Sequence, residues 1–78
     1  MVRSEILAKV NNIFKEVLDD NNIMLTDKTT TDDAEFDSLS RVPLIVAIEK
    51  AFKIKFTSHE ILSWENIGDM VDAIKKKL

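Results

Sequence analysis

Ser38 is the residue of this sequence whose type and position best suit covalent chemistry. Asp37 precedes it and Leu39 follows it, and the triplet lies where a polar stretch meets a long segment of helical apolar periodicity. We therefore expect the hydroxyl at the start of a helix, where backbone N–H groups and the helix dipole favour a phosphate ester by about 0.3–1 kcal/mol. Asp and Ser are also common N-cap residues, so a purely structural capping role is the alternative.

Two other kinds of site fit the sequence less well. A catalytic dyad of Ser38 with the single histidine, His59, would need an orienting acid and an oxyanion hole, and no visible motif supplies either. A calcium loop over residues 27–38 would have Asp32 where glycine is required and Ser38 where a bidentate glutamate is required. The absence of cysteine disfavours a zinc site and means that any thiol chemistry needs a group supplied from outside.

Composition predicts one soluble, mainly helical domain over residues 1–78. The chain is 45% hydrophobic and 32% charged, and it contains one glycine and one proline, which argues against a disordered or turn-rich protein. A net charge of −3 disfavours nucleic acid as a partner, because nucleic-acid binding depends on excess Lys and Arg. Polar and charged residues, among them Ser4, Glu5 and Lys9, interrupt the N-terminal apolar residues before they reach the length of a signal peptide or membrane span, so we expect a cytoplasmic protein.

The first half of the chain is expected to form one helix and one long loop. Apolar residues recur at three- and four-residue intervals over residues 5–18, which predicts a helix with Ser4 as its N-cap. Residues 20–37 make a long connection for so small a domain, and such loops tend to be functional or to carry some structure of their own. We expect its apolar residues to fix it to the core: Ile23, Met24, Leu25 and Phe36.

A second helix is expected over residues 39–52. Its broad apolar stripe indicates a central helix that is touched on more than one side. Pro43 lacks an N–H group and is tolerated only within a first helical turn. Either Ser40 is the true N-cap or the first turn is distorted.

The rest of the chain predicts a short third helix and a closing fourth helix. Thr57 and Glu60 have the spacing of a capping box, and the helix that they start would carry Ile61 and Leu62 inward. Asn66 is the expected N-cap of the fourth helix, whose last turn holds three lysines that suit the helix dipole. The expected fold class is all-α, a small four-helix bundle with a long loop between its first two helices. Its expected core includes Phe14, Val46, Phe52, Trp64, Ile67, Met70 and Val71.

With this order of elements, the chain resembles an acyl carrier protein over nearly its whole length. The most specific part is Asp37-Ser38-Leu39, and further matches follow at the family's spacing: Val42, Leu44, Glu49, Phe52, Ile54, Phe56, Ile67, Asp69 and Ile74. The resemblance implies that a phosphopantetheinyl transferase attaches a 4'-phosphopantetheine arm from coenzyme A to Ser38. The thiol of the arm would hold acyl groups as thioesters, and the carrier itself would not be an enzyme.

The same resemblance implies roles for other residues. Asp37 would help to present Ser38 to the transferase. Docking to partner enzymes would involve Leu39, Arg41, Val42 and Glu49, and an acyl group would lie between the second and third helices near Val46, Ile61, Leu62 and Met70. The implied partners are acyl transferases, ligases or synthases of fatty-acid, polyketide or related biosynthesis, and the carrier is expected to be a monomer.

The chain departs from the family pattern around the serine. Glu35 replaces a frequent glycine, Ser40 and Pro43 replace frequent acidic residues, and Arg41 adds a positive charge to the same face. These differences point away from the housekeeping fatty-acid pathway. An aminoacyl or peptidyl carrier, and a helical interaction module with an unmodified Ser38, are the alternatives.

Overall fold

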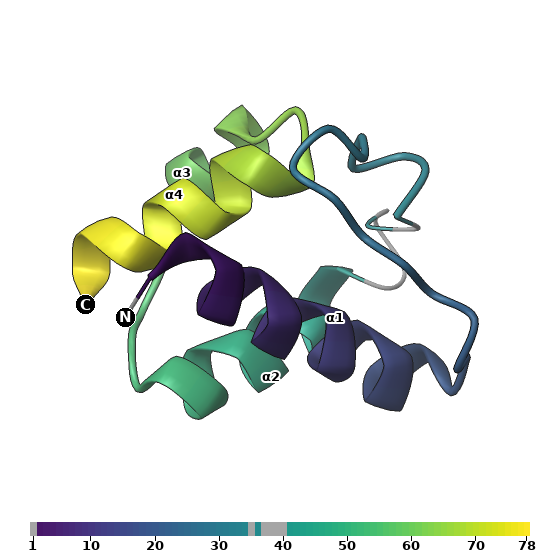
Figure 1. Ribbon diagram of the computed structural model, residues 1–78. Helices are drawn as coiled ribbons and strands as arrows, with labels where there is room; N and C mark the ends of the chain where they lie inside the picture. Colours follow the sequence, from purple (N-terminus) through teal and green to yellow (C-terminus); the bar gives the residue numbers. More distant parts are fainter. Residues whose placement is uncertain (1, 35, 37–40) are drawn as a thin grey trace.

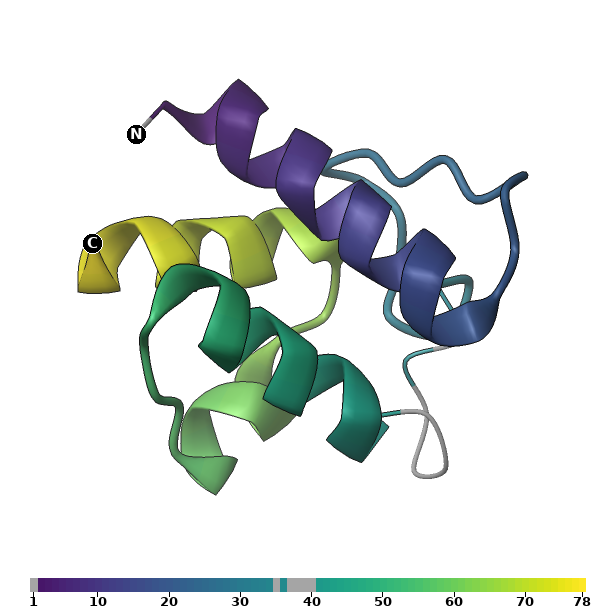
Figure 2. The same cartoon turned by 90° about the horizontal axis from the view of Figure 1, so that it is seen from below.

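Four helices make up most of the described chain. The computed structural model describes residues 2–34, 36 and 41–78, and within these ranges it contains four α-helices and no strand. They are α1 (Arg3–Leu18), α2 (Arg41–Phe52), α3 (Ser58–Ser63) and α4 (Ile67–Lys77). The first helix, α1, packs against both α2 and α4, and the long loop that follows α1 runs past the start of α4 (Figures 1 and 2). The predicted all-α bundle is confirmed.

The start of α1 differs from the prediction. Val2 is the N-cap and makes no side-chain capping bond, so the prediction that Ser4 caps this helix is wrong. Arg3, in the first turn, donates to Asp72 Oδ1 at 2.8 Å and to Asp27 Oδ2 at 2.9 Å. These tertiary contacts stabilise helical backbone at Arg3, one residue before the predicted cap. Ser4 therefore lies inside the helix.

Local capping signals correctly placed the starts of α3 and α4. Thr57 Oγ1 accepts a hydrogen bond from Glu60 N at 3.2 Å, and Glu60 Oε1 accepts one from Thr57 N at 3.0 Å, which completes the predicted capping box. Asn66 Oδ1 accepts from Asp69 N at 2.8 Å at the start of α4. The three lysines lie in the last turn of α4, as predicted.

A half-buried amide fixes the loop after α1 to that helix. Asn11 Oδ1 accepts from Leu25 N at 2.6 Å, and Asn11 Nδ2 donates to Leu25 O at 3.1 Å. Leu25 is buried and Ile23 is half-buried, as predicted, but Met24 between them is 83% exposed and is not an anchor. Successive side chains of an extended segment point to opposite sides, so only the two flanking residues can face the core.

The same loop continues to the start of α4 through backbone hydrogen bonds. Ile67 N donates to Thr29 O at 2.8 Å, and Gly68 N donates to Asp27 O at 2.9 Å. Thr30 forms an isolated antiparallel bridge with Asn66. The loop therefore carries structure of its own, as expected from its length.

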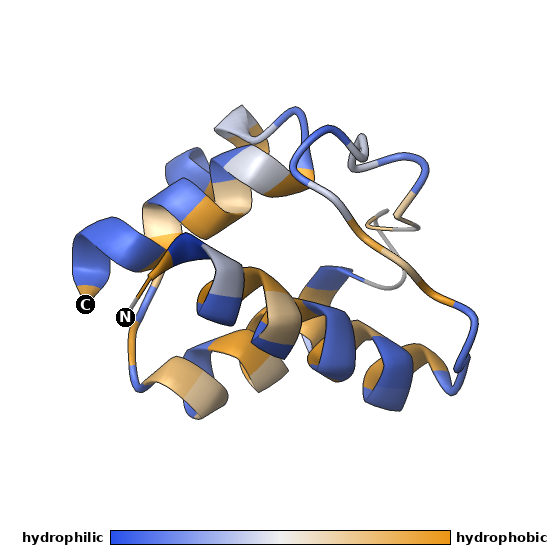
Figure 3. Cartoon of the chain, viewed as in Figure 1, coloured by the Kyte–Doolittle hydropathy of each residue, from blue (hydrophilic) through white to orange (hydrophobic). Residues whose placement is uncertain are grey.

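One core lies between the helices and the loop. Figure 3 shows α1, α2 and α4 banded by hydrophobic and hydrophilic residues, as expected for helices with one buried side. The buried residues are Ile6, Val10, Phe14, Leu25, Ala34, Phe36, Leu44, Ile45, Ile48, Phe52, Trp64, Ile67, Met70, Val71 and Ile74. The core predictions are confirmed except for Val46, which is 42% exposed. Leu44, Ile48 and Phe52 form the inward ridge of α2 at four-residue spacing, and Val46 is half a turn away from that ridge.

Candidate functional site

The triplet Asp37-Ser38-Leu39 lies outside the described residues, as do Glu35 and Ser40. The predictions that rest on these residues stay predictions. The described residues that bracket the triplet in the sequence are Phe36 on one side and Arg41 on the other. These two residues mark where the described chain stops before the triplet and resumes after it.

Phe36 is held firmly in the core, as predicted. It is 6% exposed, and its N–H donates to Thr31 O at 2.9 Å. Its ring stacks on Phe14 at a centroid distance of 6.3 Å and lies 6.0 Å from the ring of Trp64. Trp64 in turn meets Phe56 edge to face at 4.9 Å. This row of aromatic rings fixes the chain two residues before Ser38 to α1 and to the segment that joins α3 to α4.

An apolar groove of about 320 Å³ begins at Arg41, the first described residue after Ser38. It lies between α2 and α3, and it is lined by Arg41, Val42, Ile45, Val46, Ser58, Ile61 and Leu62. Val42 is 66% exposed and Leu62 is 69% exposed, so much apolar surface faces outward along the groove. The prediction that α3 carries Leu62 inward is wrong, because in this six-residue helix no residue is buried and only Ile61 packs against the core.

The groove brings together three of the four residues predicted for an acyl pocket: Val46, Ile61 and Leu62. Met70, the fourth, does not line the groove and has no exposed surface. The inward stripe of α4 places Met70 in the core with Ile67, Val71 and Ile74. This position agrees with the prediction that Met70 is a core residue.

The groove also contains residues that sequence reasoning assigned elsewhere or missed. Arg41 and Val42 were predicted for docking, and the structure places them in the same groove as the acyl-pocket residues. Ile45 and Ser58 were not predicted for the site. Ile45 follows Val42 by three positions, so helical spacing was a signal that could have found it.

Glu49, the remaining predicted docking residue, is half-buried near the end of α2. Its Oε2 accepts a hydrogen bond from Phe56 N at 2.8 Å, across the turn that joins α2 to α3. The carboxylate therefore satisfies a backbone donor of this chain. The seven-residue separation of the two groups gave no local signal for this contact.

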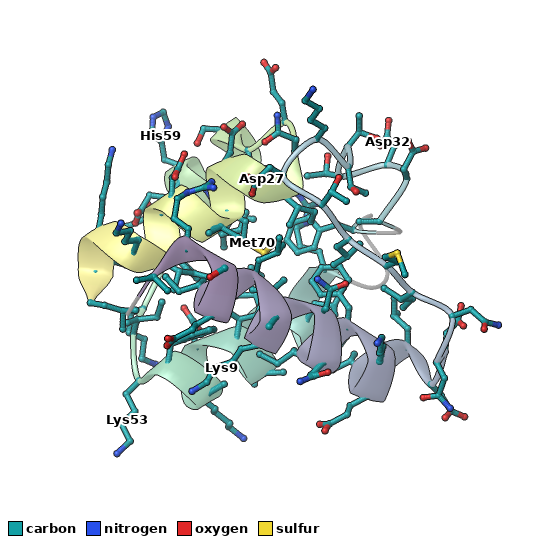
Figure 4. All side chains as sticks on the ribbon, in the orientation of Figure 1. Lys9, Asp27, Asp32, Lys53, His59 and Met70 are labelled. Atoms are coloured by element: carbon teal, nitrogen blue, oxygen red, sulfur yellow. The ribbon has the colours of Figure 1, made fainter. Side chains whose placement is uncertain are left out.

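The described residues give no sign of another kind of centre. His59 is exposed on α3, as expected, and points away from the bundle (Figure 4). Within the described ranges, no cluster of three or more His, Cys, Asp or Glu residues is arranged to hold a metal ion. Among the same residues, no helix has the length and apolar character needed to cross a membrane.

Comparison with known proteins gives consistent matches along most of the chain. The family described as "Phosphopantetheine attachment site" matches residues 8–74. An acyl carrier protein of Borreliella burgdorferi (strain ZS7) is 36% identical over 78 residues, covering 99% of this chain and 98% of the relative. The acyl carrier protein of Thermotoga maritima is 34% identical over 77 residues, covering 97% and 95%.

A solved structure agrees with these relatives. The chain is similar to the solution NMR structure of holo acyl carrier protein from Geobacter metallireducens, with a TM-score of 0.82 and 42% sequence identity. The similarity covers 92% of this chain and 84% of the other.

The fold and the comparisons together define the class of protein. A small helical bundle that matches a phosphopantetheine attachment family and acyl carrier protein relatives is a carrier and not an enzyme. The chain belongs to the acyl carrier protein family. Its cofactor is covalently attached phosphopantetheine.

Proposed function

We propose that Ser38 carries the 4'-phosphopantetheine arm, and that the chain delivers acyl groups, held as thioesters on this arm, to partner enzymes. The match to the phosphopantetheine attachment family carries the proposal, because it spans residues 8–74 and this range includes Asp37-Ser38-Leu39. A phosphopantetheinyl transferase would join Ser38 Oγ to the phosphate of the arm and release the nucleotide part of coenzyme A. Asp37 and Leu39 would present the serine to that enzyme.

The apolar groove supports acyl cargo. Removing apolar surface from water contributes about 25 cal/mol of favourable free energy for each Å². An acyl chain lying along Val42, Val46 and Leu62 would therefore be stabilised. The groove starts three residues after Ser38 in the sequence. Its α3 wall contains no buried residue, so this wall can move at low cost.

The partners in this proposal are acyl transferases, ligases or synthases of fatty-acid, polyketide or related biosynthesis. Docking would use the exposed face of α2 near Arg41 and Val42, which is contiguous with the groove. The monomeric state and the cytoplasmic location stay predictions from the sequence.

Intact-mass measurement tests the attachment. The protein is incubated with coenzyme A and a broad-specificity phosphopantetheinyl transferase, and its mass should rise by one phosphopantetheine. Ser38→Ala should stay unmodified. Ser58→Ala, which changes a serine in the lining of the groove, should be modified like the wild type.

Circular dichroism provides the folding control. Loss of a capping hydroxyl costs about 0.5–2 kcal/mol, so Ser38→Ala should keep the helical signal at room temperature. An unmodified wild-type chain would instead indicate an interaction module, and ester turnover without coenzyme A would indicate a hydrolase. Modification of Ser38→Ala would place the arm on another residue.

A further inference from the structure

The second helix and the turn after it are basic in a protein that is acidic overall. Between Arg41 and Lys55 the sequence contains Lys50 and Lys53 as further basic residues and Glu49 as its only acidic one. The whole chain has a net charge of −3. The charge of this segment is therefore opposite in sign to that of the rest of the molecule.

The single carboxylate of this segment is engaged within the chain. Glu49 Oε2 accepts from Phe56 N at 2.8 Å and closes the turn, as described above. Lys50, Lys53 and Lys55 are exposed. In the described part of the chain the ion pairs are those of Arg3 and Lys77, so these three lysines are not among the paired cations.

The three lysines surround a concavity. A hollow of about 290 Å³ is lined by Val46, Glu49, Lys50, Lys53, Ile54 and Lys55, and we call it the cationic hollow. Val46 also lines the apolar groove, so the hollow continues the groove toward the end of α2. Lys9 of α1 adds a cation beside this end, with its Nζ 5.7 Å from the ring centroid of Phe52.

Several of the described acidic residues lie on other elements. Figure 4 shows Lys9 and Lys53 in the lower left part of the molecule, Asp27 near the top centre and Asp32 at the upper right. Glu60, Asp69 and Asp72 line a separate depression on α3 and α4, where Lys76 and Lys77 also contribute. Among the described residues, a partner that approaches the end of α2 therefore meets mainly positive charge.

We propose that the partner enzyme docks on the groove and the cationic hollow through an acidic protein surface that carries an apolar side chain. This inference rests on the proposed carrier function and specifies the chemistry of its partner. The apolar side chain would lie on Val46 and Ile54, and carboxylates would meet Lys50, Lys53 and Lys55. A protruding protein segment fits a concave, partly apolar surface better than a flat lipid headgroup layer does. Charge complementarity of this kind raises the association rate at low salt.

Two peptides test the sign of this surface. One is a helical peptide with a leucine stripe flanked by glutamates, and the other is the same peptide with every glutamate replaced by lysine. Each is titrated into the full chain bearing its arm, and binding is followed by the amide NMR signals. We expect the glutamate peptide to shift the signals of residues 46–55, to bind at least about tenfold more tightly than its lysine twin, and to weaken as salt rises.

Matched variants separate local charge from net charge. Lys50→Glu with Lys53→Glu and Lys55→Glu should lose most binding of the glutamate peptide. Lys28→Glu with Lys75→Glu and Lys76→Glu gives a protein of the same net charge, and this variant should still bind the glutamate peptide. Circular dichroism confirms that both variants are folded.

Three results would overturn the inference: equal binding of the two peptides, shifts centred on residues 75–77, or binding of anionic phosphatidylglycerol vesicles in place of the peptide. The mass measurement on Ser38 is independent of all three. A carrier that takes up the arm but prefers the lysine peptide would refute the acidic partner and leave the proposed function intact.

Discussion

At the scale of single residues, Gly68 shows how closely the long loop and α4 approach each other. Its N–H donates to Asp27 O at 2.9 Å, and a Cβ at position 68 would lie 2.8 Å from the same oxygen. We expect Gly68→Ala to lower the free energy of unfolding by about 1–3 kcal/mol in urea denaturation, although alanine is normally the better helix former. Ala8→Gly, at an exposed position of α1, measures the ordinary propensity cost of about 1 kcal/mol. If Gly68→Ala were more stable than the wild type, the loop at Asp27 would be able to move away from the added methyl group at little cost.

Phe52 tests which face of α2 is buried. It belongs to the core, and Lys9 lies over its ring. We expect Phe52→Ala to cost about 3–5 kcal/mol, which would leave a domain of this size marginally stable. Val46→Ala, on the half-exposed face of the same helix, should cost about 1 kcal/mol or less. Similar melting temperatures for the two variants would contradict the assignment of the faces.

At the scale of elements, α3 depends on its capping box more than on burial. Glu60 bonds Thr57 N at 3.0 Å and pairs with Lys77 Nζ at 3.1 Å, which links α3 to α4. The Thr57 backbone hydrogen bond, followed by the bond to Lys77, lowers the pKa of Glu60 below its ordinary value. Because the carboxyl is more acidic in the folded chain, its stabilising effect is present above the ordinary glutamate pKa and is lost as the pH falls through the lowered value.

We therefore expect wild-type stability to fall more steeply than that of Glu60→Gln as the pH is lowered through the acidic range. Thermal melts across pH measure the two slopes. Lys77→Met should keep most of the wild-type slope, since the backbone hydrogen bond is the larger cause of the pKa shift. Parallel curves for wild type and Glu60→Gln would show that this carboxylate does not couple to folding.

The helix starts also show which parts of the fold can be predicted from the sequence. The starts of α3 and α4 were predictable because each depends on two residues three positions apart, Thr57 with Glu60 and Asn66 with Asp69. The start of α1 was not, because Arg3 acts through contacts with Asp27 and Asp72, far away in the sequence.

The features of the candidate site were likewise predictable only in part. Val46, Ile61 and Leu62 were placed correctly beside one another because the resemblance supplied the pairing of the second and third helices. The engagement of Glu49 with Phe56 could not be predicted, because it depends on the path of the turn between those helices. The burial of Met24, Val46 and Leu62 was overestimated, because hydrophobic character alone does not say which side of an element faces the core.

At the scale of the whole molecule, the distribution of charge matters more than its sum. The net charge of −3 predicts attraction to basic partner surfaces in general. The residues that follow Ser38 act against this prediction locally, because Arg41 is basic and Pro43 stands where the family often has an acidic residue. Both residues belong to the first turn of α2 as described, and Arg41 lines the groove.

From this arrangement we expect the arm-bearing chain to be a poor substrate for a generic fatty-acid malonyl transferase, whose docking surface is expected to be basic. Arg41→Glu with Pro43→Glu should raise the loading rate at low salt and make it fall more steeply as salt rises, because both changes restore negative charge beside the groove. Asn22→Glu with Lys28→Glu changes the net charge equally on the long loop and should leave the rate nearly unchanged. Loading rates measured across ionic strength compare the three proteins. If both double variants gain equally, net charge alone steers the encounter, and the first turn of α2 does not face this enzyme.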